Sequence, residues 1–260
     1  MKFGVNWSGA RELSCLEKFL KNGEVDFVEI LIDNFLNVDP KDIRVLLDGT
    51  AVAFHVMNSQ FLTPDACRLD YIADRLKLFA DVLGPMYISD HIGLFYTYNN
   101  LPLPQMAEVD YGNVEEYCDK LSDWQKKLGM NLLIENYPSS YPQKESQIMA
   151  YKKLLEIDGV GLLFDVSNAV IAEINNVEST SNWLDMVLLA DHFHISGFRF
   201  SSLLPSTAID THDHCIDKRS YDALMGLPIN KKNGSIVIER DDRFDYGEWA
   251  MDVVGVKALV

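Results

Sequence analysis

The chain has 260 residues, of which 48% are hydrophobic and 24% are charged, as is typical of a folded globular protein. These values exclude a disordered or low-complexity chain, and a single α/β barrel fits the length better than two small domains. Lys and Arg number 23 against 39 Asp and Glu, so the formal net charge is −16. Such a surface repels phosphate backbones and anionic lipids. We therefore expect no nucleic-acid or membrane partner, and a cation or a basic peptide instead.

Short apolar segments alternate along the chain with longer amphipathic ones. The short segments predict strands buried on both faces of a parallel sheet, over residues 3–7, 27–31, 52–56, 86–91, 132–137, 161–166, 192–198 and 235–240. Between them, helical patterns occupy residues 64–83, 110–128, 146–157 and 181–189, and Gly84 and Gly129 stand at two expected helix ends.

This order of elements predicts an α/β fold, a (β/α)₈ barrel of the TIM type, forming a single domain over residues 1–260. No Pro-, Gly- or Ser-rich linker interrupts the alternation. An open, doubly wound sheet of six or seven strands is the alternative. It is disfavoured because no glycine-rich phosphate loop follows the first predicted strand.

The compartment is predicted from the absence of targeting signals and from the cysteines. The amino-terminal segment has no apolar stretch of signal-peptide length, and no apolar run approaches a membrane span. Cys15, Cys67, Cys118 and Cys215 are widely spaced and form no CxxC pair. We expect a soluble protein of the reducing cytoplasm.

Imidazole and carboxylate side chains occupy the last six predicted strands, mostly near the carboxyl ends, where a barrel places its active site. These residues are His55, His91, Glu135, Asp165, His194 and Glu239. Three further candidates come soon after the sixth and seventh predicted strands: Asn168, Asp210 and His212.

These nine residues predict a metal centre. Several carboxylates and imidazoles that converge inside a barrel repel one another, or lie desolvated and unpaired, unless cations neutralise them. Zinc, manganese and non-heme iron commonly take such ligands, and no cysteine is present to indicate a structural thiolate site. Nine ligands exceed the three or four of one catalytic metal, so we expect two or three ions. Each residue alone has an ordinary structural explanation; the strand-by-strand repetition carries the prediction.

The motifs VEILIDNF, AFHV, YISDHI, LIENYPS, LLFDVSNA, HFHISG, DTHDH and IERD resemble those of the multinuclear non-heme iron-dependent oxidases. Within that family they are most similar to the MbnB branch, the oxidase subunits of methanobactin biosynthesis. The resemblance extends from the first to the last predicted strand. It implies a TIM-like barrel related in layout to endonuclease IV and xylose isomerase.

The resemblance also implies how the ligands divide among three metals. The first would be bound by His55, His91 and Glu135. Glu135 would bridge to a second, which Asp165, His194 and Glu239 complete. The third would be held by Asn168, Asp210 and His212, with Asn168 standing where the endonuclease pattern has a histidine.

The function implied by the resemblance is oxidation of a peptide. Two or three iron ions, in mixed Fe(II)/Fe(III) states, would use dioxygen to convert a cysteine of a ribosomally made precursor to an oxazolone with an adjacent thioamide. The product would be methanobactin, a copper-binding peptide. The implied partners are an MbnC-like protein, forming a heterodimer, and an MbnA-like precursor peptide with a basic leader.

Two other functions remain open on the residues alone. A divalent-metal-dependent hydrolase or isomerase on the same barrel would use the same ligand types. A non-catalytic peptide-binding subunit with vestigial metals is the other, and the intact ligand set disfavours it.

Asp241 is a candidate catalytic residue of a different kind. Strand side chains alternate between faces, so the carboxylates of Glu239 and Asp241 are expected on the same side, with Asp241 nearer the barrel mouth. From there Asp241 would act as a general base toward the peptide. The competing interpretation is a helix N-cap or an ion pair with a neighbouring arginine.

Overall fold

Eight parallel strands close into a barrel in the computed structural model, which describes residues 1–63, 66–97, 101–229 and 234–260. The barrel strands are β1 (Lys2–Trp7), β2 (Phe27–Leu31), β3 (Ala51–Val56), β4 (Ile88–His91), β7 (Leu132–Glu135), β8 (Val160–Asp165), β9 (His192–Ser196) and β12 (Ser235–Glu239). Around the barrel they run in chain order, and β12 pairs with β1 to close the sheet. The predicted fold class is confirmed.

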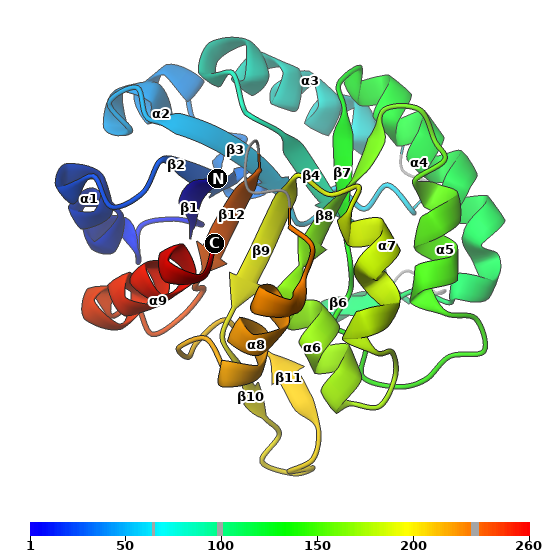
Figure 1. Ribbon diagram of the computed structural model, residues 1–260. Coiled ribbons are helices and arrows are strands. Elements are labelled where there is room, and N and C mark those ends of the chain that lie inside the picture. Colours follow the sequence, from blue (N-terminus) through cyan, green and yellow to red (C-terminus); the bar gives the residue numbers. More distant parts are fainter. Residues whose placement is uncertain (64–65, 98–100, 230–233) are drawn as a thin grey trace.

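Helices surround this barrel (Figure 1). They are α1 (Leu13–Asn22), α2 (Pro40–Leu46), α3 (Ala66–Leu83), α4 (Val114–Leu128), α5 (Gln147–Leu154), α6 (Val166–Ile174), α7 (Leu184–Val187), α8 (Lys218–Gly226) and α9 (Tyr246–Leu259). Short 3₁₀ turns occupy η1 (Ile32–Phe35), η2 (Tyr111–Asn113) and η3 (Thr180–Trp183). Among the described residues, none of the helices is both long and apolar enough to cross a membrane.

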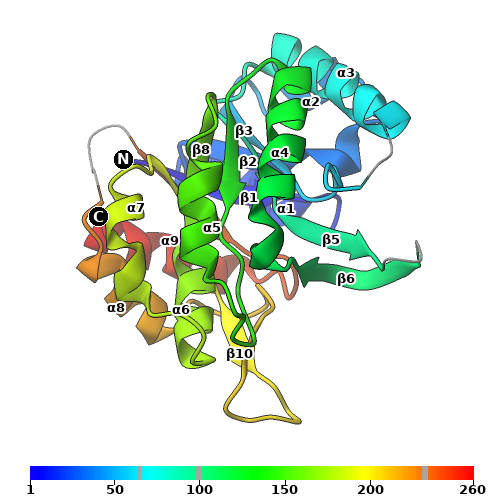
Figure 2. The same cartoon turned by 90° about the vertical axis from the view of Figure 1, so that its right-hand side faces the viewer.

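Two antiparallel hairpins extend from the barrel (Figures 1 and 2). One comprises β5 (Gly93–Tyr96) and β6 (Pro102–Glu108), which follow β4. The other comprises β10 (Phe198–Phe200) and β11 (Ala208–Asp210), which follow β9. Both therefore leave the barrel at the carboxyl ends of its strands, where an active site is expected.

Each predicted strand coincides with a barrel strand, although four end earlier than expected, β12 by only one residue, at Glu239. Strand β7 ends at Glu135 and β9 at Ser196, because the chain then turns into loops or into β10. Strand β8 ends at Asp165, whose side chain accepts a hydrogen bond from the Asn168 amide and thereby caps α6.

The four predicted helices are also present, in shorter form. The segment 64–83 corresponds to α3, and its first two residues, 64–65, lie outside the described residues. The segment 181–189 is divided between η3 and α7. Gly84 and Gly129 follow α3 and α4 with φ of 62° and 66°, as their predicted positions at helix ends require. Helices α1, α2, α6, α8 and α9 and both hairpins have no counterpart among the predicted elements.

The barrel interior changes from apolar to polar along its axis. Toward the amino ends of the strands, Phe27, Ala53, Tyr87 and Val237 pack against one another. Gly4 leaves room for the Phe27 ring, which a Cβ there would approach to 2.6 Å. Because side chains alternate, the inward residue two positions later on each of these strands is polar: Glu29, His55, Ser89 and Glu239. An apolar layer thus closes the barrel beneath a polar floor.

Gly197 allows the segment after β11 to return to the end of β9. A Cβ at Gly197 would lie 1.9 Å from the carbonyl oxygen of His214. The Gly197 carbonyl oxygen accepts a hydrogen bond of 3.0 Å from the His212 amide. This close approach brings His212 to the barrel mouth.

We predict that Gly197→Ala lowers the free energy of unfolding by about 1–3 kcal/mol, because the new methyl group overlaps backbone that is itself held in place. Gly226→Ala is the control, since Gly226 ends α8 and an added Cβ there meets no atom within 4 Å. Thermal denaturation of both variants measures the difference. Equal melting temperatures would contradict the close packing at Gly197.

Candidate metal centre

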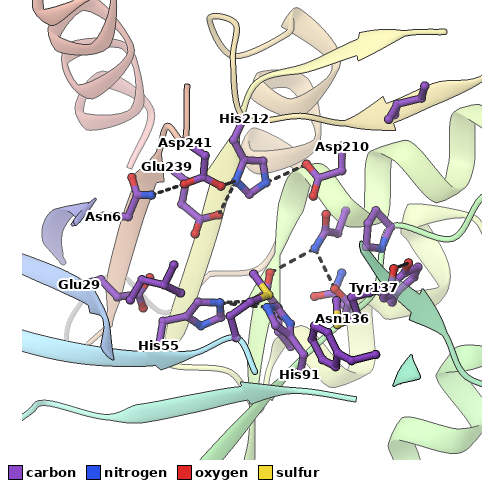
Figure 3. A pocket seen from close by; sticks show the side chains of 18 of the residues that line it. Asn6, Glu29, His55, His91, Asn136, Tyr137, Asp210, His212, Glu239 and Asp241 are labelled. Atoms are coloured by element: carbon purple, nitrogen blue, oxygen red, sulfur yellow. Dashed lines mark hydrogen bonds and ion pairs between the residues drawn. The ribbon is translucent and has the colours of Figure 1, made fainter. Parts of the chain in front are cut away.

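A cavity of about 430 Å³ opens at the carboxyl ends of the barrel strands. One part of its lining is polar and comes from the barrel strands and the segment after β11 (Figure 3). The other part is apolar and comes largely from the two hairpins and the loop after β7, through Phe95, Met106, Tyr137, Pro138 and Ile209.

Three groups of side chains at this end of the barrel are arranged so that each could hold a metal ion. They are His55, His91 and Glu135; Glu135, Asp165, His194 and Glu239; and Glu29, His55 and His194. Within each group, one possible ligand atom per residue lies within 4.8 Å of the others. Because Glu135, His55 and His194 each belong to two groups, the three positions adjoin one another.

His55 and His91 present neutral imidazoles. The Nε2 atoms of the two rings lie 3.0 Å apart, and Oε2 of Glu135 lies 3.6 Å from a nitrogen of each ring. Ser89 Oγ donates to the Phe54 carbonyl and lies 2.8 Å from His55 Nδ1, so it accepts the Nδ1 proton and leaves Nε2 free. Burial lowers the pKa of His91 to about 3 and, together with the charge of His91, holds the pKa of His55 well below its usual value. Neutral imidazole is the form that binds metals.

Two carboxyl groups, those of Glu135 and Glu239, lie close to His194, and a third, that of Asp165, belongs to the same metal-holding group. His194 Nδ1 lies 3.2 Å from Glu239 Oε1 and 3.7 Å from Glu135 Oε1. Burial raises the pKa values of Glu135, Asp165 and Glu239 to about 7 each. Three neighbouring acids are therefore partly protonated near neutral pH, as expected where anions are crowded away from water.

Two of the three residues predicted to bind the third metal, Asp210 and His212, are partly exposed and lie nearer the cavity mouth. The third, Asn168, is buried. His212 Nε2 lies 2.7 Å from Asp210 Oδ1, and His212 Nδ1 lies 2.9 Å from Asp241 Oδ2 (Figure 3). Asn168 Nδ2 donates to Glu135 Oε1 over 3.1 Å, which leaves the Asn168 Oδ1 atom available. Asp210 and His212 fall in none of the metal-holding groups of His, Cys, Asp and Glu found among the described residues.

Asp241 faces the cavity, on the same side as Glu239, as predicted. Its Oδ1 accepts a hydrogen bond of 2.7 Å from Asn6 Nδ2, and its side chain remains 47% exposed. Burial alone raises the pKa of Asp241, but the charge of His212 and the hydrogen bonds from His212 and Asn6 hold it below its usual value. The side chain of Asp241 thus contacts His212 and Asn6, while only its carbonyl oxygen contacts an arginine, Arg11.

Buried polar atoms without a hydrogen-bond partner indicate whether the predicted ligand side chains fit metal cations. Five of the nine predicted ligands have a buried side-chain oxygen or nitrogen that makes no hydrogen bond to any described residue: Glu135, Asp165, Asn168, His194 and Glu239. The corresponding atoms of Asp210 and His212 lie 2.7 Å apart and face each other as an ion pair. Buried polar atoms normally have partners, because an unsatisfied one costs free energy. Cations bound among these atoms would satisfy them, so the residues fit a multinuclear metal centre.

Glu29 was not predicted as a site residue, although it lies in the quoted motif VEILIDNF. It is 1% exposed and belongs to one metal-holding group. An acidic residue in the middle of an otherwise apolar strand is the signal that could have identified it. Asn6 and Asn136 were also missed; Asn136 accepts from the Asp165 amide over 2.7 Å and so joins the ends of β7 and β8.

Comparison with known proteins identifies the family. A family model described as "RiPP precursor modification enzyme MbnB/TglH/ChrH" matches residues 3–254; RiPPs are ribosomally made, post-translationally modified peptides. A UPF0276 protein of Rhizorhabdus wittichii is 32% identical over 233 residues, covering 84% of this chain and 80% of that protein. One from Caulobacter vibrioides is 30% identical over 240 residues, with the same coverage.

Solved structures show the fold of the barrel. The 3-keto-D-glucoside 4-epimerase YcjR of E. coli has a TM-score of 0.64 and 16% identity, with 99% of each chain covered. A fusion of a xylose isomerase-like TIM barrel with 4-hydroxyphenylpyruvate dioxygenase has a TM-score of 0.69 and 13% identity, covering 98% of this chain and 42% of that one. The family model spans the same barrel almost from end to end, and the protein accordingly belongs to the MbnB/TglH/ChrH family of RiPP precursor modification enzymes.

Proposed function

We propose that this chain is a multinuclear non-heme iron oxidase of methanobactin biosynthesis. It uses dioxygen to convert a cysteine of a ribosomally made precursor peptide to an oxazolone with an adjacent thioamide. Membership of a family that modifies precursor peptides supports the substrate class. The observation that carries the multinuclear centre is that Glu135 belongs to two adjacent metal-holding groups, so one carboxylate is placed to serve two ions.

The ligand sets follow from the groups. We assign His55, His91 and Glu135 to one iron, and Glu135, Asp165, His194 and Glu239 to a second. Asn168, Asp210 and His212 are assigned to a third, supported by the unpaired buried Oδ1 of Asn168 and by the 2.7 Å separation of Asp210 Oδ1 and His212 Nε2. When bound in mixed Fe(II)/Fe(III) states, iron supplies a site for a substrate thiolate and the redox chemistry that dioxygen requires.

The chain's own residues would position the peptide and move a proton. The apolar wall of Phe95, Met106 and Ile209 excludes water and receives the side chains that flank the reacting cysteine. Asp241 is ionised near neutral pH, partly exposed and at the cavity mouth. It is our candidate general base for the peptide nitrogen or the cysteine during cyclisation.

The partners are proposed from family and charge. The net charge of −16 suits a basic leader on an MbnA-like precursor, which long-range attraction would steer to the enzyme. We propose that an MbnC-like protein forms a heterodimer with this chain and helps hold the precursor. All four cysteines are free thiols, which supports a reaction in the reducing cytoplasm.

We predict that the stability of the metal-free protein depends on pH and that the stability of the metal-loaded protein does so much less. The folded pKa values of Glu135, Asp165 and Glu239 are about 7, above the values near 4.3 and 3.9 of unfolded Glu and Asp. Between about pH 4 and 7 the metal-free fold therefore binds more protons than the unfolded chain, and the stability that these protons contribute is lost as pH rises through 7. Metal displaces these protons, so metal affinity rises over the same range. Melting temperatures between about pH 5 and 8, with and without metal, measure both proteins: the metal-free protein should lose stability, and the metal-loaded protein, whose ligands are already deprotonated, should change little. Equal slopes would contradict the assignment.

We predict that Glu135→Ala loses more metal than Asn168→Ala, because Glu135 is assigned to two ions and Asn168 to one. Anaerobically purified protein supplied with ferrous iron should hold more than one iron per chain. Elemental analysis of the three proteins measures this. Equal losses from the two variants, or a single zinc after iron reconstitution, would contradict the assignment and favour a metal-dependent hydrolase or isomerase.

The function itself is tested by oxygen uptake. Iron-loaded protein mixed with precursor peptide and partner should consume dioxygen while the peptide loses hydrogen mass; the zinc-loaded protein should do neither. Asp241→Asn should keep its iron and its affinity for the peptide, because an amide can still accept from His212, yet form product far more slowly. Normal turnover of a fully loaded Asp241→Asn protein would remove Asp241 from the mechanism. Absence of oxygen uptake by the loaded wild type would overturn the proposed function.

A further inference from the structure

Glu29 lies in the polar floor of the cavity, next to the apolar layer of the barrel interior. It follows Phe27 on the inward side of β2 and is 1% exposed. Burying an unpaired carboxylate is costly, so its partners indicate what it does.

Glu29 links a tyrosine to a histidine of the proposed centre. The Tyr87 hydroxyl donates to Glu29 Oε2 over 2.6 Å. His194 Nε2 lies 2.9 Å from Glu29 Oε1 and 3.0 Å from Oε2. Tyr87 and His194 are themselves buried, so no exposed group competes for these contacts. The result is a buried chain from Tyr87 through Glu29 to His194.

The two nitrogens of His194 therefore have different surroundings. Nε2 faces Glu29, whereas Nδ1 faces Glu239 and Glu135 and makes no hydrogen bond to any described residue. A neutral imidazole has one N–H and one lone pair. A carboxylate on one nitrogen retains the proton there and leaves the lone pair on the other.

We propose that Glu29 is a positioning residue for the metal centre: it holds the Nε2 proton of His194 so that Nδ1 presents its lone pair to the cation shared with Glu135 and Glu239. Tyr87 fixes the carboxylate in turn. The inference rests on the proposed metal site and adds the residue that orients one of its ligands.

A second pair in the same cavity has the same arrangement. His212 Nδ1 lies 2.9 Å from Asp241 Oδ2, and its Nε2 lies 2.7 Å from Asp210 Oδ1, a proposed ligand of the third metal. In both rings a carboxylate faces one nitrogen while the opposite nitrogen faces the cluster.

Glu29 also belongs to a metal-holding group with His55 and His194, so a direct ligand role is the competing explanation. A cation bound there through Nε2 would move the His194 proton to Nδ1, the nitrogen that faces Glu135 and Glu239 and that the cation shared with them requires. Glu29 Oε2 is further engaged by Tyr87. These contacts favour the positioning role, and the two roles differ in the number of ions bound.

Cobalt(II) titration of the metal-free protein tests the proposal, with affinity, number of ions at saturation and visible absorption as readouts. Glu29→Ala should lower the affinity by roughly 10–100-fold, as loss of a carboxylate behind a ligating histidine typically does. Glu29→Gln and Tyr87→Phe should show smaller losses, because the Gln oxygen can accept the Nε2 proton and Tyr87→Phe removes only the hydroxyl that supports Glu29. The number of ions at saturation should stay unchanged, while the absorption of the bound cobalt shifts.

Glu108→Gln is the matched control, because Glu108 is buried, contacts Ser139 and lies outside all three metal-holding groups. Its affinity should equal that of the wild type, and the melting temperatures of the metal-free proteins show whether each variant folds. Wild-type affinity and absorption in folded Glu29→Gln and Tyr87→Phe would overturn the proposal. Loss of one ion at saturation would overturn it in favour of a ligand role. A wild type that binds no metal would overturn the proposed centre and this inference together.

Discussion

Uncompensated negative charge inside a closed barrel is the constraint on which the rest of this structure depends. Glu29, Glu135, Asp165 and Glu239 are buried beside one another, where the loss of water opposes ionisation. At Glu29 the contacts with His194 and Tyr87 offset this cost, whereas at the other acids mutual repulsion adds to it. The raised pKa values of three of them show how strongly the folded chain favours protons at this place. Buried acids crowded in this way fit a site that binds protons or metal cations from solution.

The fold tolerates this cluster because its backbone is fixed from several directions. Below it, Phe27, Ala53, Tyr87 and Val237 fill the barrel. Beside it, the Asp165 side chain caps α6 with one oxygen while its other oxygen remains free toward the cluster. Asn136 both donates to and accepts from the backbone of Asp165. Rigid strand ends therefore set the positions of the acids, and little reorganisation is needed when a cation arrives.

The sequence was sufficient for those parts of the fold that short-range pattern determines. The barrel strands are short apolar runs that alternate with amphipathic segments. The acids and imidazoles of the site could be recognised because they occur near the carboxyl ends of those runs. The hairpins could not be predicted, because their pairing depends on contacts across loops; Pro102 and Pro104 within β6 also argue against a strand. Glu29 shows a different limit. Its role depends on Tyr87, which is 58 residues away, and on His194, which is 165 residues away, and no local pattern reports such contacts.

The hairpin β10–β11 carries a mechanical consequence for the centre. Asp210 is the last residue of β11, and His212 follows it with a backbone φ of 47°, held by the carbonyl of Gly197. Leu203 and Leu204, between the two strands of the hairpin, are largely exposed. The tip of the hairpin is thus exposed to solvent, whereas its base, next to the barrel, carries the candidate ligands Asp210 and His212. A partner whose binding at the free end shifts the hairpin would change the metal affinity at Asp210 and His212. Metal binding would then change the affinity for that partner by the same factor, because coupling between two sites is reciprocal.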